Sequence, residues 1–375
     1  FTASYSQVSS STAQRARLNS NGENCGRRKR SAVNPVPAVK KGVPPSLTQL
    51  SILIPDQQLS DNAGYGGMGQ FVYAENDSGR GVAFWVDGRD GQLIYRGYRA
   101  RFFENGEPAG SSFWVDKVHS AYVYTMEGVL DAAVDSRGRT YFVYGDENQM
   151  RAKIYGPDGT VITERFGIRD PGMEKVGQYP RVGVDSSGTA FAVWLDLRHG
   201  YVDQSIYGQR FRADGTLLGS NINIYQDELG WENPVDIAVD PSGKTVVVWE
   251  KRVGWDDFYV MGRIYSETGN PVGNPFRLDS NTMENSRLPA VAAAGQNLFA
   301  AAWNRGERYS EGIVILKKYR LEQNELVAAD STMFTPQDNW VETQLSIDRQ
   351  GNMIISGGAG QTFMLLDDKL NTYSL

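Results

Sequence analysis

The chain has 375 residues, of which 41 are glycine and one is cysteine, with 11% aromatic residues and a formal net charge of -6. No stretch approaches the roughly 18 consecutive apolar residues that a membrane-spanning helix needs, and a single cysteine excludes an internal disulfide. Glycine at about one residue in nine exceeds the usual ~7% and, with the aromatic content, favours a β-rich fold. The chain starts at Phe1 without a start methionine or an apolar signal segment, which predicts a processed or trimmed N-terminus.

Residues 1–45 differ from the rest of the chain in charge and composition. They carry eight Lys or Arg against the single acid Glu23, which gives +7, so residues 46–375 carry -6 minus 7, or -13. Serine is frequent at the start of this segment and proline at its end, which is typical of an extended arm. We therefore divide the chain into a basic arm, residues 1–45, and a folded body, residues 46–375.

The basic run from Arg27 to Arg30 follows Cys25 in the arm. Three interpretations fit the run: a site for an anionic polymer, a processing site, or a segment that docks on the acidic body. Docking within one chain or onto a neighbouring subunit is favoured by the opposite charges, and the second case predicts a homo-oligomer. Cys25 either forms a disulfide with a second chain or is an inert thiol. The charge of the body disfavours nucleic acid as its partner.

The body contains one pattern six times, a turn closed by Gly or Asn and followed by an apolar run. The copies start at residues 76, 135, 185, 240, 294 and 348 and read NDSGRGVAFWVD, DSRGRTYFVYGD, DSSGTAFAVWLD, DPSGKTVVVWEK, AGQNLFAAAWNR and DRQGNMIISGGA. Five copies carry an aromatic six residues after the turn glycine or asparagine: Trp85, Tyr144, Trp194, Trp249 and Trp303. Six units of about 55 residues favour one closed array over separate domains.

Each unit predicts four antiparallel strands. Asp-x-x-Gly between two apolar runs is a tight hairpin, in which the Asp side chain caps the turn and the Gly takes a positive φ. A third apolar run follows, and a second polar turn such as Asn105-Gly106 or Asp158-Gly159 leads into a more variable fourth strand. The chain is therefore predicted to be an all-β, six-bladed β-propeller.

The two ends of the body predict how the ring closes. The sixth unit reaches Leu375 just after its third strand, and residues 46–60 resemble the fourth strand of the third unit. We expect this N-terminal strand to complete the last blade, so that removing residues 1–60 destabilises the ring whereas removing residues 1–40 does not.

The Asp-x-x-Gly units with their terminal aromatics resemble the blade repeats of secreted bacterial β-propeller proteins and, more loosely, the Asp-box turns of sialidases. An Asp-box has a shorter spacing from Asp to Gly and a preceding Ser, and no match to the arginine triad of sialidases is present. The resemblance implies a secreted or cell-surface propeller and carries no activity with it.

Four loops between the second and third strands are longer than the others and are predicted to stand on one face. They combine Arg with aromatic and acidic residues, which suit sugar faces and carboxylates. The candidate ligand-binding residues are Arg89, Arg198, His199, Tyr201, Arg252, Trp255, Asp256, Arg305, Arg308 and Tyr309. Solvated loops with ordinary ion pairs are the alternative.

Acids recur just after the aromatic of four units, at Asp87, Asp146, Asp196 and Glu250, and two further groups of acids recur as well. One precedes each inner strand and is predicted to lie near the central mouth, where it binds a cation or a basic segment, or serves packing: Glu127, Glu174, Glu232, Glu284 and Glu342. The other comprises the turn aspartates Asp135, Asp185, Asp240 and Asp348, which fit turn caps and, less well, calcium ligands. We expect no other metal or cofactor.

The chain has only two histidines, His119 and His199, which argues against a zinc site with several imidazoles. His119 lies in a long loop with Tyr122 and Tyr124. These three residues and His199 are weak candidates for a lyase base. The sequence therefore predicts a secreted or surface module that binds a glycan or a surface protein. The alternatives are a polysaccharide lyase, a glycoside hydrolase, or a filament subunit assembled through the arm.

Overall fold

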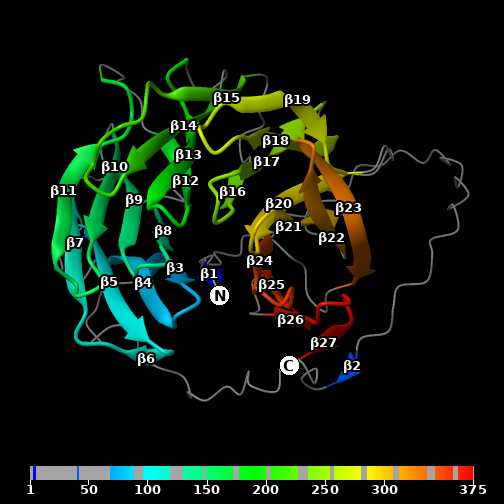
Figure 1. The fold of residues 1–375 in the computed structure, drawn as a ribbon, viewed down its shortest axis with the longest axis horizontal. Helices are drawn as coiled ribbons and strands as arrows, with labels where there is room; N and C mark the ends of the chain where they lie inside the picture. The colour runs from blue at the N-terminus through cyan, green and yellow to red at the C-terminus, as the bar shows by residue number, and fades with distance from the viewer. Residues whose placement is uncertain are drawn as a thin grey trace, which may run out of the picture.

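A computed structural model of the chain describes residues 3–5, 40–41, 68–87, 96–118, 130–146, 149–171, 177–199, 204–226, 235–253, 257–279, 285–306, 312–335, 343–357 and 362–374. The regular elements of these residues are β-strands, and within them no helix is long and apolar enough to cross a membrane. The strands form six sheets around a central opening, and the chain passes once around the ring (Figure 1). The predicted six-bladed β-propeller is confirmed.

Each blade is a four-stranded antiparallel sheet in which the strands follow chain order from the centre outward. Blade 1 holds β3 (Met68–Glu75), β4 (Arg80–Asp87), β5 (Arg96–Glu104) and β7 (Phe113–Val118), with the short β6 (Glu107–Pro108) also on β5. Blade 2 holds β8 (Leu130–Val134), β9 (Thr140–Asp146), β10 (Gln149–Tyr155) and β11 (Val161–Gly167), and blade 3 holds β12 (Gly177–Val184), β13 (Thr189–Asp196), β14 (Ser205–Arg212) and β15 (Ile222–Gln226). Blade 4 holds β16 (Val235–Val239), β17 (Thr245–Arg252), β18 (Phe258–Tyr265) and β19 (Pro271–Arg277), and blade 5 holds β20 (Ser286–Ala293), β21 (Leu298–Arg305), β22 (Ile313–Glu322) and β23 (Glu325–Phe334).

Blade 6 corrects the expectation that its fourth strand is missing from the C-terminal unit. It holds β24 (Thr343–Ile347), β25 (Met353–Gly357), β26 (Thr362–Leu366) and β27 (Thr372–Ser374), and β27 pairs antiparallel with β26. A turn at Asp367–Leu370 provides this strand, because Leu370 takes a φ of 59° and Asp367 Oδ1 accepts two backbone N–H bonds. Residues 46–60, the expected closing strand, lie outside the described residues.

Two short pieces of the arm pair with the ring. Strand β1 (Ala3–Tyr5) pairs antiparallel with β3 at the inner edge of blade 1 and also contacts β24 of blade 6. Strand β2 (Lys40–Lys41) pairs in parallel with β27 at the outer edge of blade 6. The arm therefore touches the first and the last blade, through β1 at the inner edge of blade 1 and β2 at the outer edge of blade 6.

The first turns of the blades have the predicted chemistry, except in blade 5. In blade 4, Asp240 Oδ1 accepts hydrogen bonds from the backbone of Ser242 and Lys244 at 2.8 and 3.0 Å, and Gly243 takes a φ of 95°. In blade 5, where Ala294 replaces the capping acid, Asn297 takes the positive φ of 60°. The second turns behave alike, and their residues with positive φ include Asn105, Gly106, Gly159, Gly215, Gly269, Gln323 and Asn324.

The core lies between neighbouring blades. The recurrent aromatics are buried there, each at most 1% exposed: Trp85, Tyr144, Trp194, Trp249 and Trp303. Trp194, for example, packs with Met150 and Ile154 of blade 2, so it fills the space between the two sheets. The prediction that the recurrent aromatics join the blades is confirmed for Tyr144, Trp194, Trp249 and Trp303, which pack with residues of the preceding blade. Trp85 packs within blade 1 among the described residues.

The inner strands alternate between two lengths around the ring. Strands β3, β12 and β20 of blades 1, 3 and 5 have eight residues and a register shift, whereas β8, β16 and β24 have five residues and none. Tyr179 and Leu288 take positive φ values of 52° and 54° at two of these shifts, a conformation that is costly for large side chains. The six strands line a central channel of about 1170 Å³.

Candidate functional site

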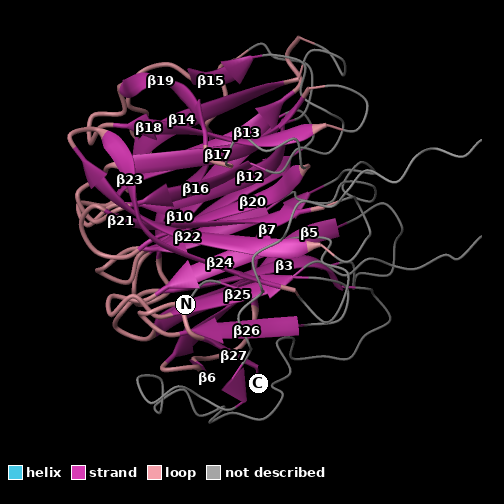
Figure 2. Ribbon diagram, turned by 90° about the vertical axis from the view of Figure 1, so that its right-hand side faces the viewer, coloured by secondary structure: helices cyan, strands magenta, loops and turns pink. Residues whose placement is uncertain are grey.

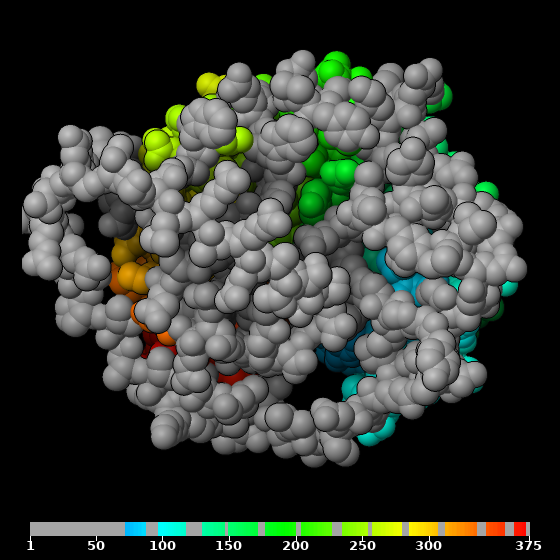
Figure 3. Space-filling view, turned by 180° about the vertical axis from the view of Figure 1, so that it is seen from behind, coloured from blue at the N-terminus to red at the C-terminus, as the bar shows by residue number. Residues whose placement is uncertain are grey.

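The two ends of the ring differ in chemistry. At one end, which we call the turn end, tight turns join the first two strands of each blade; these turns gather on the left in Figure 2. At the opposite end, which we call the loop end, the second strands finish in buried polar residues: Asp87, Asp146, Asp196, Glu250 and Asn304. Described atoms of the first, third and fifth blades are visible from this side in cyan, green and orange (Figure 3).

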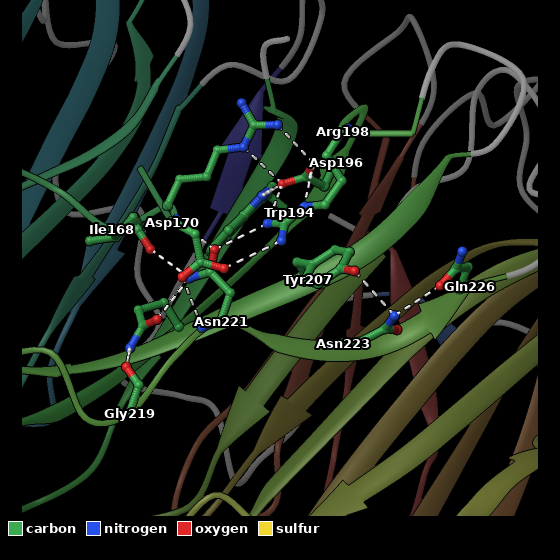
Figure 4. Close-up of polar contacts among 12 residues, drawn as sticks. Ile168, Asp170, Trp194, Asp196, Arg198, Tyr207, Gly219, Asn221, Asn223 and Gln226 are labelled. Atoms are coloured by element: carbon green, nitrogen blue, oxygen red, sulfur yellow. Dashed lines mark hydrogen bonds and ion pairs between the residues drawn. The ribbon is translucent and has the colours of Figure 1, made fainter. Parts of the chain in front are cut away.

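Asp196 is the centre of the most extensive charge network at the loop end (Figure 4). Arg169 of blade 2 donates from Nε and Nη2 at 3.0 and 2.9 Å, and Arg198 donates from Nε and Nη2 at 3.0 Å each. Trp194 Nε1 donates at 2.8 Å. Burial acts to raise the pKa of Asp196, but the hydrogen bonds from Arg198, Arg169 and Trp194 outweigh it and lower the pKa to about 2.

Arg198 links this network to the outer part of the ring. Its guanidinium carbon lies 3.6 Å from the centroid of the Tyr207 ring, and its Nη atoms reach Asp170 at 3.4 Å and Asn221 at 3.1 Å. The side chain of Arg198 is only 8% exposed. Since Arg198 stands just before residues 200–203, the network fixes the base of the predicted ligand-binding loop.

The same end of blades 1 and 2 carries a second network. Arg165 lies 3.1 Å from Asp116 of blade 1 and 3.6 Å from Asp146 of blade 2. Tyr144 donates to Asp116 at 3.0 Å. One guanidinium therefore offsets the repulsion between two carboxylates that stand on adjacent blades.

Glu250 ties blade 4 to the bulge of blade 5. It accepts from Arg287 Nη2 at 3.0 Å and from the backbone N–H of Leu288 at 3.1 Å. Burial raises the pKa of Glu250, and Arg287 opposes that shift. Arg287 also stacks on Phe258, with 3.8 Å between the guanidinium carbon and the ring centroid. The left-handed backbone at Leu288 is thus held by a carboxylate of the neighbouring blade.

The central channel contains a separate polar group. Asp131 on β8 and Asp236 on β16 each accept a backbone N–H from the next blade, from Val182 and Val291, at 2.8 Å. Arg181 Nε of the intervening blade lies 3.8 Å from Asp236. Burial raises the pKa of Asp131 to about 7, although Arg181 acts in the opposite direction. A carboxyl that titrates near neutrality in a channel is a candidate functional group.

The structure describes four of the ten predicted ligand-binding residues: Arg198, His199, Arg252 and Arg305. All four lie at the loop end, on or just after the second strands of blades 3, 4 and 5. Arg198 is held by carboxylates and Tyr207, as described above. The others lie outside the described residues: Arg89, Tyr201, Trp255, Asp256, Arg308 and Tyr309.

The predicted central-mouth acids lie outside the described residues as well: Glu127, Glu174, Glu232, Glu284 and Glu342. So do three of the four catalytic candidates, His119, Tyr122 and Tyr124. Cys25 and the run from Arg27 to Arg30 belong to the same group. Their predicted roles stay predictions.

The sequence allows two roles for the turn aspartates, turn capping and calcium binding. In Asp185, Oδ1 accepts from the backbone of Ser187 and Thr189 at 2.8 and 2.9 Å, and capping is therefore the role that the contacts display. Within the described residues, no three His, Cys, Asp or Glu side chains are grouped in a way that would hold a metal ion.

Sequence reasoning missed Arg169, Asn221, Asp131 and Arg181. Arg169 and Asn221 stand on or beside the variable fourth strands, which share no pattern between units. Asp131 and Asp236 recur four residues before the turn aspartates Asp135 and Asp240, and this spacing was available as a signal. The signal is weak because the same position holds Arg181 in blade 3.

A scan against models of known protein families finds no match, and no curated protein matches the chain. Solved structures do match. A protein of unknown function from Dyadobacter fermentans has a TM-score of 0.50 at 6% identity, over 80% of this chain and 91% of that one. The GH93 α-L-arabinofuranosidase of Fusarium graminearum, solved with arabinobiose, has a TM-score of 0.47 at 13% identity, over 78% and 90%. The calcium-binding protein regucalcin from Agrobacterium tumefaciens has a TM-score of 0.43 at 12% identity, over 80% and 91%. At such identities the likeness concerns the fold.

Proposed function

We propose that the protein is an extracellular or cell-surface binding module that recognises a glycan through the loop end of the propeller. The observation that carries this proposal is the concentration of buried, paired charges at that end. At the turn end, buried carboxylates act mainly within their own turns: Asp185 caps the backbone of its turn, and Asp135 pairs with Arg139 four residues later. At the loop end, Asp196 and Glu250 instead hold arginines from other strands.

Such networks support binding because they fix the bases of loops before a ligand arrives. A loop whose base is already ordered loses less conformational entropy on binding, which raises affinity without any new contact. Residues 88–95, 200–203, 254–256 and 307–311 connect strands whose described ends lie at the loop end. These segments contain Tyr201, Trp255 and Tyr309, whose rings suit the faces of sugars.

Arg198 takes a narrower role in this proposal than the sequence alone predicts. Its guanidinium already binds Asp196 and Asn221 and stacks on Tyr207. Arg198 is therefore a positioning residue that orders the segment containing Tyr201. Direct contact with the ligand is assigned to Tyr201, Trp255 and Tyr309.

The basic arm supplies attachment in this proposal. Its charge of +7 opposes the -13 of the body, and β1 and β2 already pair with the edges of blades 1 and 6. The same pairing between chains would give a homo-oligomer. Light scattering at low and high salt tests this part, since a species that stays monomeric at low salt contradicts it.

A glycan array tests the binding proposal. The full chain is compared with Trp255→Ala, Arg198→Lys and the matched control Arg137→Lys, which changes an exposed arginine at the turn end. We expect specific glycan binding that Trp255→Ala removes, Arg198→Lys weakens and the control leaves unchanged. Binding of no glycan, or equal binding by all variants, contradicts the proposal. New ultraviolet absorbance from unsaturated sugar ends would favour a lyase over a binding module.

A further inference from the structure

At three junctions, a residue near the end of the fourth strand of one blade faces a residue of the next blade. The facing residue stands two positions after the buried aromatic of its own blade. At the junction of blades 2 and 3 the pair is Arg169 and Asp196, at 2.9 Å. At the junction of blades 1 and 2, Arg165 bridges Asp116 and Asp146. At the junction of blades 3 and 4 the pair is Tyr225 and Lys251, with the Lys251 Nζ 5.6 Å from the Tyr225 ring centroid. The third junction thus replaces a carboxylate by a cation.

Among the described residues, this replacement leaves the indole N–H of Trp249 without a hydrogen-bond partner. Trp85 Nε1 donates to Asp87 at 3.2 Å and Trp194 Nε1 donates to Asp196 at 2.8 Å, two residues further along in each case. In blade 4 the corresponding residue is Lys251, which accepts no hydrogen bond through its ammonium group. Trp249 is fully buried, and its Nε1 has no hydrogen-bond partner among the described residues. A buried donor without an acceptor is unfavourable, and therefore calls for an acceptor.

The surroundings of Trp249 favour an anion with a ring attached. The Tyr225 ring lies 5.0 Å from the Trp249 ring at an angle of 38° and is partly exposed. Arg263 donates from Nη1 to the Ile224 carbonyl at 3.0 Å, and its Nε is buried without a partner among the described residues. The junction therefore combines the Trp249 N–H, which has no partner among the described residues, with the Lys251 cation and the aromatic face of Tyr225.

We propose that the junction of blades 3 and 4 is a subsite for the carboxylate of an acidic glycan, a polymer of uronic acid. The uronate carboxylate takes the position that Asp196 holds in blade 3. It accepts the N–H of Trp249 and is neutralised by Lys251, while the sugar ring lies against Tyr225. This inference rests on the proposed function and specifies its ligand class.

The inference is tested by titrating the full chain with oligogalacturonate and with its fully methyl-esterified form. The variants are Lys251→Gln and Trp249→Phe. Lys369→Gln is the matched control for the first, because Lys369 is an exposed lysine in the turn of blade 6. Trp303→Phe is the control for the second, because Trp303 Nε1 is also buried without a partner among the described residues. Beside blade 5, the position of Tyr225 is taken by Asp279, whose charge acts on Tyr319 of blade 5 and whose carboxylate is bound by Arg277 at 2.6 Å.

We expect the acid form to bind about tenfold more tightly than the ester, since a hydrogen bond to a charged group carries roughly that factor or more. Lys251→Gln and Trp249→Phe should each lose about tenfold in affinity for the acid form, and both controls should keep wild-type affinity. In a ¹⁵N spectrum, the indole resonance that Trp249→Phe removes should shift on addition of oligogalacturonate but not of the ester.

The outcomes separate this inference from the proposed function. Equal binding of acid and ester, or full affinity in Lys251→Gln, overturns the subsite while glycan recognition at the loop end stands. Binding of neutral glycans alone would also overturn the subsite and leave glycan recognition at the loop end standing. If no glycan of either kind binds, both proposals fail.

Discussion

Arg169 and Asp196 belong to neighbouring blades and form a two-point ion pair in which neither side chain is exposed to solvent. The two contacts measure 3.0 Å from Nε to Oδ2 and 2.9 Å from Nη2 to Oδ1. Such a pair gains energy from the low dielectric around it and loses energy from desolvation, so its net contribution is modest while both partners remain. Removing one partner is costly because the other charge stays buried.

Arg169→Met should therefore destabilise the propeller by about 3 kcal/mol, the usual cost of breaking a buried pair. Asp196 keeps Arg198 as a partner, which limits the loss. Urea denaturation followed by tryptophan fluorescence gives the free energy of unfolding. The control is Arg349→Met, since Arg349 pairs with Asp77 at 2.5 Å with both side chains more than half exposed. An exposed pair of this kind contributes at most about 1 kcal/mol. Equal losses in the two variants would contradict the role given to burial.

Asp131→Asn should stabilise the protein at pH 8 by about 2 kcal/mol and leave its stability near pH 4 unchanged. The reason is that burial raises the pKa of Asp131 to about 7 in the folded state. A raised carboxyl pKa contributes stability that is fully present below the unfolded value and is lost as the pH rises through about 7. An amide oxygen can still accept the Val182 N–H that Asp131 accepts at 2.8 Å.

Asp196→Asn provides the contrasting case for the same measurement. The pKa of Asp196 is lowered to about 2, so its contribution is present at neutral pH and is lost as the pH falls toward that value. Urea midpoints between pH 3 and pH 9 should show the Asp131→Asn benefit growing with pH, while Asp196→Asn is less stable than the wild type at pH 7. A wild-type profile that is flat between pH 4 and pH 8 would refute the prediction for Asp131.

The fold could be read from the sequence because its determinants are local and repeated. The Asp240 turn needs only a carboxylate, a glycine and two apolar runs, and the same requirement returns around the ring. The fourth strand of blade 6 was missed because it has only three residues, Thr372–Ser374, and follows a turn in which Leu370 rather than Gly takes the positive φ. A leucine in that conformation gives no signal in a sequence.

The site could be predicted only in part, because its contacts join residues that are far apart in the chain. The sequence placed Arg198 at the loop end but did not reveal that Arg169, 27 residues before Asp196, binds the same carboxylate. Fourth strands share no residue pattern, and a partner contributed by such a strand depends on the twist and spacing of two blades. The pairing of Asp116 with Arg165, 49 residues apart, illustrates the same limit.

Removal of residues 1–5 should lower the thermal midpoint of unfolding by a few degrees. Strand β1 pairs with β3 and contacts β24, so it covers the junction between the first and last blades. An uncovered inner edge leaves backbone N–H and C=O groups unpaired. Circular dichroism on the truncated and full chains measures the shift. An unchanged midpoint would contradict this prediction and would agree with the expectation from the sequence that residues 1–40 are dispensable for stability.

Asp240→Ala should cost about 2–3 kcal/mol, more than the loss of an ordinary turn cap. Its Oδ1 accepts the backbone N–H groups of Ser242 and Lys244, and its Oδ2 accepts the backbone N–H of Asn297 in blade 5 at 3.0 Å. One carboxylate thus closes a turn and joins two blades. Asp367→Ala is the matched control, because Asp367 Oδ1 accepts the backbone N–H groups of Lys369 and Asn371, both in its own turn. In urea unfolding Asp240→Ala should lose more stability than Asp367→Ala, and if the two lose the same amount, the contact between the blades contributes nothing to stability.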